Sequence, residues 1–140
     1  MKLITVKATI NVPLSQVWEK WTSAHHVTKW NFASPDWYCP SAENNLVEGG
    51  EFHHLMAAKD GSFQFDFWGT YQKITNEKSL DITIGDGRKM FVSFEKSGDQ
   101  TILEERFEPE NENSEELQQA GWQAILDNFK EYVESSLTTS

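Results

Sequence analysis

The sequence has a single cysteine and no long apolar run, and each shortage excludes a class of protein. Cys39 is alone among 140 residues, so no disulfide can form within the chain. No stretch approaches the roughly 18 apolar residues of a membrane-spanning helix. Residues 3–12 alternate apolar and polar side chains and lack the unbroken apolar core of a secretory signal. These features together predict a cytoplasmic protein without a membrane span.

Cations are also scarce, since 12 lysine and arginine residues face 22 acidic ones and give a formal charge of -10. The basic residues are scattered along the chain and form no stripe. A surface of this sign repels phosphate backbones. Nucleic acid is therefore not an expected partner.

Aromatic side chains are abundant, with 6 Trp, 9 Phe and 3 Tyr. A chain of 140 residues fits one domain spanning 1–140, which buries about two-thirds of the surface that the unfolded chain exposes. Large rings must therefore fill or line the interior of that domain.

Alternation of apolar and polar residues predicts an antiparallel sheet. Residues 3–12 form a half-buried strand, and 13–30 form two short helices after it. Residues 31–45 are predicted to be the longest irregular stretch. From 51 to 108 the period of two persists through several strands separated by glycine-containing turns.

The tail from Asn113 onward has helical spacing of its apolar residues. Asn113 followed by Glu116 predicts a capping box at the start of a long helix. Gly121 inside this helix costs about 1 kcal/mol relative to alanine. We therefore expect either another backbone in close approach or deliberate room beside Gly121.

Three motifs occur in a specific order: GG-x-F at 49–52, DGS-x-x-F-x-F-x-GTY at 60–71 and GWQAILDNF at 121–129. With PLSQVWEKWTSAHHVTKW at 13–30, this order resembles the START-like or SRPBCC superfamily. It most resembles the Aha-type family, named after activators of the ninety-kilodalton heat-shock protein ATPase. The resemblance implies an α+β helix-grip fold, as in the birch-pollen allergen. A curved antiparallel sheet of six or seven strands would wrap around the long C-terminal helix.

Members of this superfamily enclose a cavity between sheet and helix, and they bind lipids, polyketides or other hydrophobic small molecules. The resemblance thus implies a cavity facing the inward sides of the strands, including Met56, Leu80, Ile82, Met90 and Val92. A solid core remains the equal alternative. The predicted ligand-binding set is Trp30, Trp37, Phe52, His54, Phe65, Phe67, Tyr71, Arg88, Phe94, Glu105, Trp122, Ile125 and Phe129. In this set Trp30 and Trp37 would form the mouth.

Glu105 is the most informative member of the set. Leu103 and Phe107 fix the inward phase of their strand, and Glu105 lies between them on the same side. A buried carboxylate needs a cation, a donor, water, a ligand or a proton. Arg88 and His54 are the candidate partners. The alternative is an exposed edge position or a structural ion pair.

Asp66 and Trp68 have the opposite phase and are predicted to face outward unless a bulge at Gly69 shifts the register. The pairs His25–His26 and His53–His54 cannot chelate one ion, because adjacent side chains diverge. We predict no metal site and no cofactor. No catalytic motif is present, and no catalytic residue is assigned.

A binding domain for a hydrophobic, lipid-like or polyketide-like molecule is the favoured function. A cyclase-like or hydrolase-like enzyme that uses Glu105 and His54 in the same pocket is an alternative. A stress-related or chaperone-associated module that binds a protein partner, or forms a homodimer, is another. We expect a stand-alone domain without the additional N-terminal domain of the co-chaperones, which argues against chaperone activation.

Overall fold

The computed structural model describes residues 2–138. Within that range seven strands form one antiparallel sheet in the order β1-β7-β6-β5-β4-β3-β2, so β1 and β2 are its edges. The elements in chain order are β1 (Ile4–Ile10), α1 (Leu14–Thr22), α2 (Ala24–Trp30), β2 (Trp37–Asn44), β3 (Glu51–Ala58), β4 (Gln64–Thr75), β5 (Ser79–Ile84), β6 (Lys89–Ser97), β7 (Gln100–Phe107) and α3 (Glu115–Thr138).

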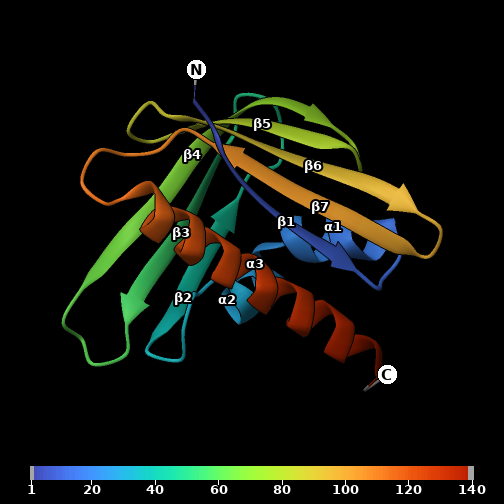
Figure 1. Cartoon of the computed structure of the whole chain (residues 1–140), viewed down its shortest axis with the longest axis horizontal. Coiled ribbons are helices and arrows are strands. Elements are labelled where there is room, and N and C mark those ends of the chain that lie inside the picture. Colours follow the sequence, from blue (N-terminus) through green and yellow to red (C-terminus); the bar gives the residue numbers. More distant parts are fainter. Residues whose placement is uncertain (1, 139–140) are drawn as a thin grey trace.

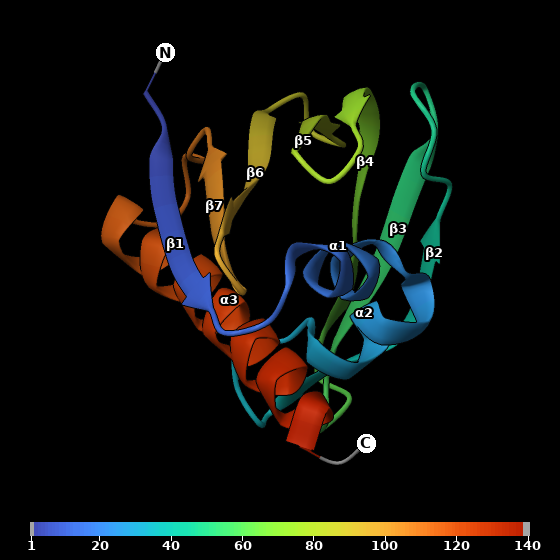
Figure 2. The same ribbon diagram turned by 90° about the vertical axis from the view of Figure 1, so that its right-hand side faces the viewer.

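The sheet curls into a half-barrel whose concave side faces the helices. α3 crosses the sheet diagonally (Figure 1), and the view turned by 90° shows α1 and α2 inside one end of the curl (Figure 2). This arrangement confirms the predicted α+β helix-grip fold. No helix in residues 2–138 has the combination of length and apolar character needed to cross a membrane.

Strand β1 shows the predicted alternation, with every second residue buried. Its outer edge is covered by α3, whose side chains bind β1 backbone groups. Gln119, Gln123 and Lys130 donate side-chain N–H groups to the backbone oxygens of Thr5, Lys7 and Thr9, respectively. Gln123 also accepts the backbone N–H of Lys7 at 3.3 Å, so one amide side chain satisfies both groups of that residue. Edge strands left open invite pairing with other chains, and α3 closes this one.

Strand β2 corrects the prediction that 31–45 is irregular. Residues Trp37–Asn44 pair with β3, with a register shift between Tyr38 and Ser41. Pro40 lies at that shift, where a missing N–H removes no ladder hydrogen bond. The alternation of apolar and polar residues is interrupted in this segment, so the sequence pattern did not indicate this edge strand.

The start of α3 differs from the predicted capping box. The hydroxyl of Ser114, not the side chain of Asn113, accepts the hydrogen bond from the backbone N–H of Leu117. Leu117 therefore occupies the position predicted for Glu116. A Cβ atom added at Gly121 would meet nothing within 4 Å. The glycine thus leaves room, and no second backbone approaches it.

Candidate functional site

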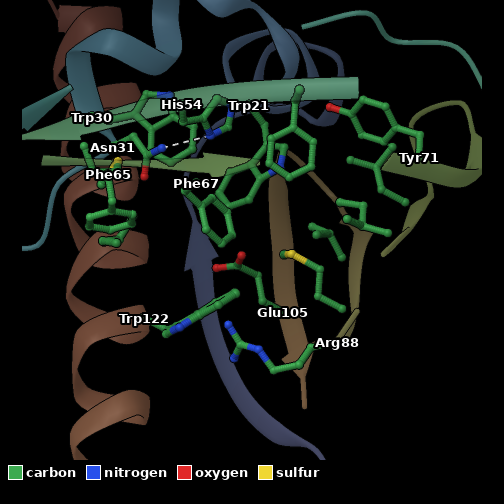
Figure 3. A pocket seen from close by; sticks show the side chains of 17 residues that line it. Trp21, Trp30, Asn31, His54, Phe65, Phe67, Tyr71, Arg88, Glu105 and Trp122 are labelled. Carbon is green, nitrogen blue, oxygen red and sulfur yellow. Dashed lines mark hydrogen bonds between the residues drawn. The ribbon is translucent and has the colours of Figure 1, made fainter. Parts of the chain in front are cut away.

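A cavity of about 260 Å³ lies between the concave face of the sheet and α3. Figure 3 shows its walls from close by. The lining residues are Trp21, Trp30, Asn31, Phe52, His54, Met56, Phe65, Phe67, Tyr71, Leu80, Ile82, Arg88, Met90, Val92, Glu105, Trp122 and Ile125. Most of them come from alternate positions of β3 to β7, because the strand period sends every second side chain to the concave side.

Trp122 connects α3 to two separate strands of the sheet, β7 and β4. Its indole stacks on Phe107 of β7 with ring centroids 3.7 Å apart and meets Phe67 of β4 edge-on at 6.0 Å. Rings in these two geometries attract one another beyond the area that they bury. The helix is thereby held over the cavity as a fixed wall.

Glu105 lies on the inward face of β7, as predicted, and is 4% exposed. Its carboxyl group points into the cavity beside Trp122 (Figure 3). Within residues 2–138 no donor binds it and no basic group lies within 4.0 Å of its oxygens. Burial in this setting raises the pKa of Glu105 from 4.5 to about 8. The carboxyl group is therefore neutral at pH 7.

Arg88, a candidate partner of Glu105, binds other groups. Its Nε donates to the Asp86 carboxylate at 2.7 Å, and its Nη1 donates to the backbone oxygen of Glu108 at 3.1 Å. These contacts hold the guanidinium at one end of the cavity without an ion pair to Glu105. Within residues 2–138, Arg88 is therefore not an ion-pair partner of Glu105.

His54, the other candidate partner, is held by Asn31. The Nδ2 of Asn31 donates to Nδ1 of His54 at 3.0 Å, shown as a dashed line in Figure 3. Burial lowers the pKa of His54 to about 4, although the charge of Asp66 opposes the shift. The ring is therefore neutral at pH 7 with its proton on Nε2. His54 on β3 and Glu105 on β7 are separated by three strands of the sheet.

The hydroxyl of Tyr71 is already engaged, because it donates to Oδ1 of Asn44 at 2.6 Å. Asn44 in turn donates its amide to the backbone oxygen of Thr22 at the end of α1. Tyr71 contributes its ring to the cavity wall, and its hydroxyl ties the sheet to the helical end.

Asp66 and Trp68 face outward, as predicted. His53 beside them binds Asp66 at 2.7 Å and Glu51 at 2.9 Å, and its ring stacks on Trp68 at 5.5 Å. The register of β4 shifts between Tyr71 and Lys73, beyond Gly69. The predicted phase of the strand before that point is therefore preserved.

Gly69 has a packing role, and the bulge that would have turned Asp66 inward does not occur there. A Cβ atom there would lie 2.9 Å from the backbone oxygen of Thr83 and 3.0 Å from the ring of Phe52. Phe52 is the cross-strand partner of Gly69, so its ring lies against bare backbone. This close approach shapes the cavity wall between β3 and β4.

All but three members of the predicted ligand-binding set line the cavity. Phe94 and Phe129 lie instead in the core at the helical end, where Phe129 meets Trp21 at 5.0 Å and Trp30 at 4.8 Å. Trp37 lies beside Phe65, with ring centroids 6.1 Å apart, and does not line the cavity.

Phe65 is 44% exposed and belongs both to the cavity wall and to a surface cluster with Trp37 and Phe63. Phe63 is 57% exposed at the β3–β4 turn. Its alternation with Phe65, Phe67 and Tyr71 predicts a side chain directed at the long helix, and this prediction is wrong because Phe63 lies before the first residue of β4.

The predicted set omitted Trp21 and Asn31 from the helical end. The inward spacing of Trp21 with Val17 and Trp18 was visible in the sequence. That this ring reaches the cavity depends on how α1 packs inside the curl. Asn31 directly follows Trp30, which was predicted at the mouth; in the structure it ends α2 and is a buried polar residue with 6% exposure. In residues 2–138, no three His, Cys, Asp or Glu side chains gather as a metal site would require.

Comparisons with known proteins agree with this architecture. The solution structure of an AHSA1-like protein from Aeromonas hydrophila is 41% identical, with a TM-score of 0.90 over 96% of this chain and 94% of that one. A protein from Cytophaga hutchinsonii is 47% identical, with a TM-score of 0.82 over 98% and 95% of the two chains. A Nitrosomonas europaea protein, at 19% identity and a TM-score of 0.82 over 97% and 96%, shares the fold.

No curated protein matched the chain significantly. The family model described as Activator of Hsp90 ATPase homolog 1-like protein matches residues 11–134. The chain therefore belongs to the family of Activator of Hsp90 ATPase homolog 1-like proteins, within the SRPBCC superfamily.

Proposed function

We propose that this protein binds a small, largely apolar molecule between the sheet and α3. The observation that carries the proposal is the cavity of about 260 Å³, lined by aromatic and aliphatic side chains and by a few polar groups. Small-molecule sites are typically concave, mostly apolar and roughly 300–1,000 Å³ in volume. A volume near the lower end favours a compact ligand over a long lipid chain.

The polar groups of the lining are few and separated, so they could fix the orientation of a bound molecule. Glu105 and the His54–Asn31 pair lie on different parts of an otherwise apolar wall. A bound molecule would make packing contacts with the side chains that line the cavity. Binding would then draw its affinity from apolar contact and its orientation from these polar groups.

The enzyme alternative has less support, because Glu105 and His54 are on strands separated by three others and do not form a pair. The protein-interaction alternative draws on the family's name and on an exposed aromatic cluster, Trp37, Phe63 and Phe65.

The cytoplasmic location remains a proposal from the single cysteine, Cys39, which is buried.

A thermal-shift screen of fatty acids, flavonoids and polyketides, repeated on a variant with a filled cavity, tests the proposal. Val92→Phe adds a ring to the β6 wall, whereas Val47→Phe makes the same change at a site that is 53% exposed. A ligand at 100 times its Kd stabilises the native state by about 2.7 kcal/mol. We expect such stabilisation in the wild type and in Val47→Phe, and its loss in Val92→Phe.

Overpacking costs about 1–3 kcal/mol, so the unfolding curve of Val92→Phe without ligand must first show a cooperative transition. If it does not, Ile82→Phe on β5 replaces it, since Ile82 lines the same wall. The proposal is wrong if no compound stabilises the wild type, or if filling the cavity leaves the stabilisation unchanged.

A further inference from the structure

On the basis of the proposed function, we infer that the cavity selects an uncharged ligand with an oxygen acceptor, such as a ketone, that accepts a hydrogen bond from the protonated carboxyl group of Glu105. The choice among neutral, cationic and purely apolar ligands follows from the groups that surround Glu105 on each element packed against it.

Apolar groups enclose Glu105 from both neighbouring strands and from the helix. Its cross-strand partners are Val6 on β1 and Val92 on β6, each 1% exposed. Trp122 of α3 covers the same end of the cavity. Within residues 2–138 the carboxyl group therefore has no hydrogen-bond donor to stabilise a negative charge, and only 4% of the Glu105 surface is exposed.

The titratable or charged groups of the lining, apart from Glu105, are Arg88, His54 and Tyr71. Arg88 is paired with Asp86, and the Tyr71 hydroxyl donates to an asparagine of β2. His54 is neutral at pH 7, because burial lowers its pKa to about 4. None of them binds the carboxyl group of Glu105.

Burial without a partner raises the pKa of Glu105 to about 8, so the free protein at pH 7 carries a carboxylic acid at this position. A neutral acid offers one O–H donor. The carboxyl oxygens of Glu105 belong to the cavity lining, so a ligand oxygen in the cavity can accept the hydrogen bond of this donor. Because Nδ1 of His54 accepts from Asn31, the neutral ring carries its N–H on Nε2, so the second polar residue of the lining also has a donor.

Three probes with one bicyclic skeleton separate the possibilities: indane is apolar, 1-indanone adds a ketone and 1-aminoindane adds a cation. Their Kd values are measured by chemical-shift titration at pH 6.5 and pH 9.5, on either side of the pKa of Glu105. The variants are Glu105→Gln, which keeps a donor, and Glu105→Leu, which has none. Glu104→Gln is the control on the other face of β7.

We expect the affinity of 1-indanone relative to indane to fall about tenfold in Glu105→Leu, as the loss of one hydrogen bond of about 1.4 kcal/mol implies. In the wild type and in Glu104→Gln, the same ratio should fall on moving from pH 6.5 to pH 9.5. In Glu105→Gln it should be retained at both pH values, because the amide donor does not ionise.

Other outcomes overturn the inference in distinguishable ways. Equal ratios in all variants at both pH values would leave an apolar binding cavity without a role for the Glu105 donor. Tighter binding of 1-aminoindane than of 1-indanone at pH 6.5, lost in Glu105→Gln, would show an anionic anchor for a cation. If no probe binds the wild type, the proposed function itself loses its support and the inference falls with it.

Discussion

At the scale of single residues, burial sets the charge of the ionisable side chains on the concave side. Glu105 and His54 carry opposite charges when ionised, and desolvation disfavours both charged forms. Their pKa values therefore move in opposite directions, to about 8 and about 4. At pH 7 both side chains are neutral, which suits a cavity for an apolar molecule.

His53 and His54 are adjacent in sequence and should titrate on opposite sides of their ordinary pKa of 6.5. Hydrogen bonds to Asp66 and then Glu51 raise the pKa of His53, whereas burial lowers that of His54 to about 4. We expect an NMR pH titration to show His53 above 6.5 and His54 near 4, with the His54 proton on Nε2. A His54 pKa above 6 would contradict the neutral, buried ring.

These two shifts act on stability in different pH windows. The raised pKa of His53 gives a contribution that is present below pH 6.5 and is lost as pH rises through the folded-state value. For His54 the unfolded chain binds the proton more readily, so stability falls as pH drops from about 6.5 to about 4.

Replacing Glu105 should remove a loss of stability that occurs as the pH rises from about 4.5 to about 8. The folded protein holds the Glu105 proton more tightly than the unfolded chain, so its contribution declines between about pH 4.5 and pH 8. In urea unfolding we expect Glu105→Gln to gain about 2–4 kcal/mol relative to the wild type between pH 5 and pH 9. Glu104→Gln, half-buried on the other face, should retain the wild-type decline.

If the stability difference between Glu105→Gln and the wild type is the same at pH 5 and pH 9, Glu105 is not the buried neutral acid described above. The inward phase of Glu105 followed from Leu103 and Phe107 in the sequence alone. Its lack of a partner did not, because Arg88 and His54 were plausible until their bonds to Asp86 and Asn31 were known.

At the scale of elements, α3 does more than cover the cavity, since it completes the open edge of β1. Gln123 binds both backbone groups of Lys7, whereas Gln119 makes a single bond to Thr5. We expect Gln123→Ala to lower the free energy of unfolding by about 1–2 kcal/mol and Gln119→Ala to lower it by about half as much. Chemical denaturation of both variants measures this, and equal or negligible losses would argue against the edge contact.

Replacing Gly121 by alanine should increase the stability of the protein. An alanine methyl group would meet no atom within 4 Å, and alanine favours the helix by about 1 kcal/mol. We expect Gly121→Ala to raise the Tm by about 2–4 °C. Because Gly121 does not line the cavity, probe affinity should stay unchanged. A lower Tm would mean that the space beside Gly121 is needed by the fold.

Regular alternation made β1 and the strands from β3 to β7 predictable, and β2 marks where that signal fails. Its burial pattern is broken by the shift between Tyr38 and Ser41, with Pro40 within it. The pairing with β3 that makes it a strand is a long-range contact. Local propensity carries no information on such a contact.

At the scale of the whole molecule, the curl of the sheet decides which inward side chains line a cavity and which fill a core. Phe94, Phe129 and Phe67 all point inward, yet only Phe67 lines the cavity. The other two are covered by the tryptophans of α1 and α2, which occupy one end of the curl. The period of the sequence predicts which face of the sheet or helix a side chain lies on. It does not predict how deeply the helices pack into the curl, which decides whether that side chain lines the cavity.

The most direct test of the binding account is a set of intermolecular NOEs between 1-indanone and the protein's methyl groups. We predict contacts to Leu80, Ile82, Val92 and Ile125, which line the cavity, and none to the exposed Val47. Contacts confined to surface methyl groups, or no contacts at concentrations that saturate the chemical-shift changes, would contradict a ligand site between the sheet and α3.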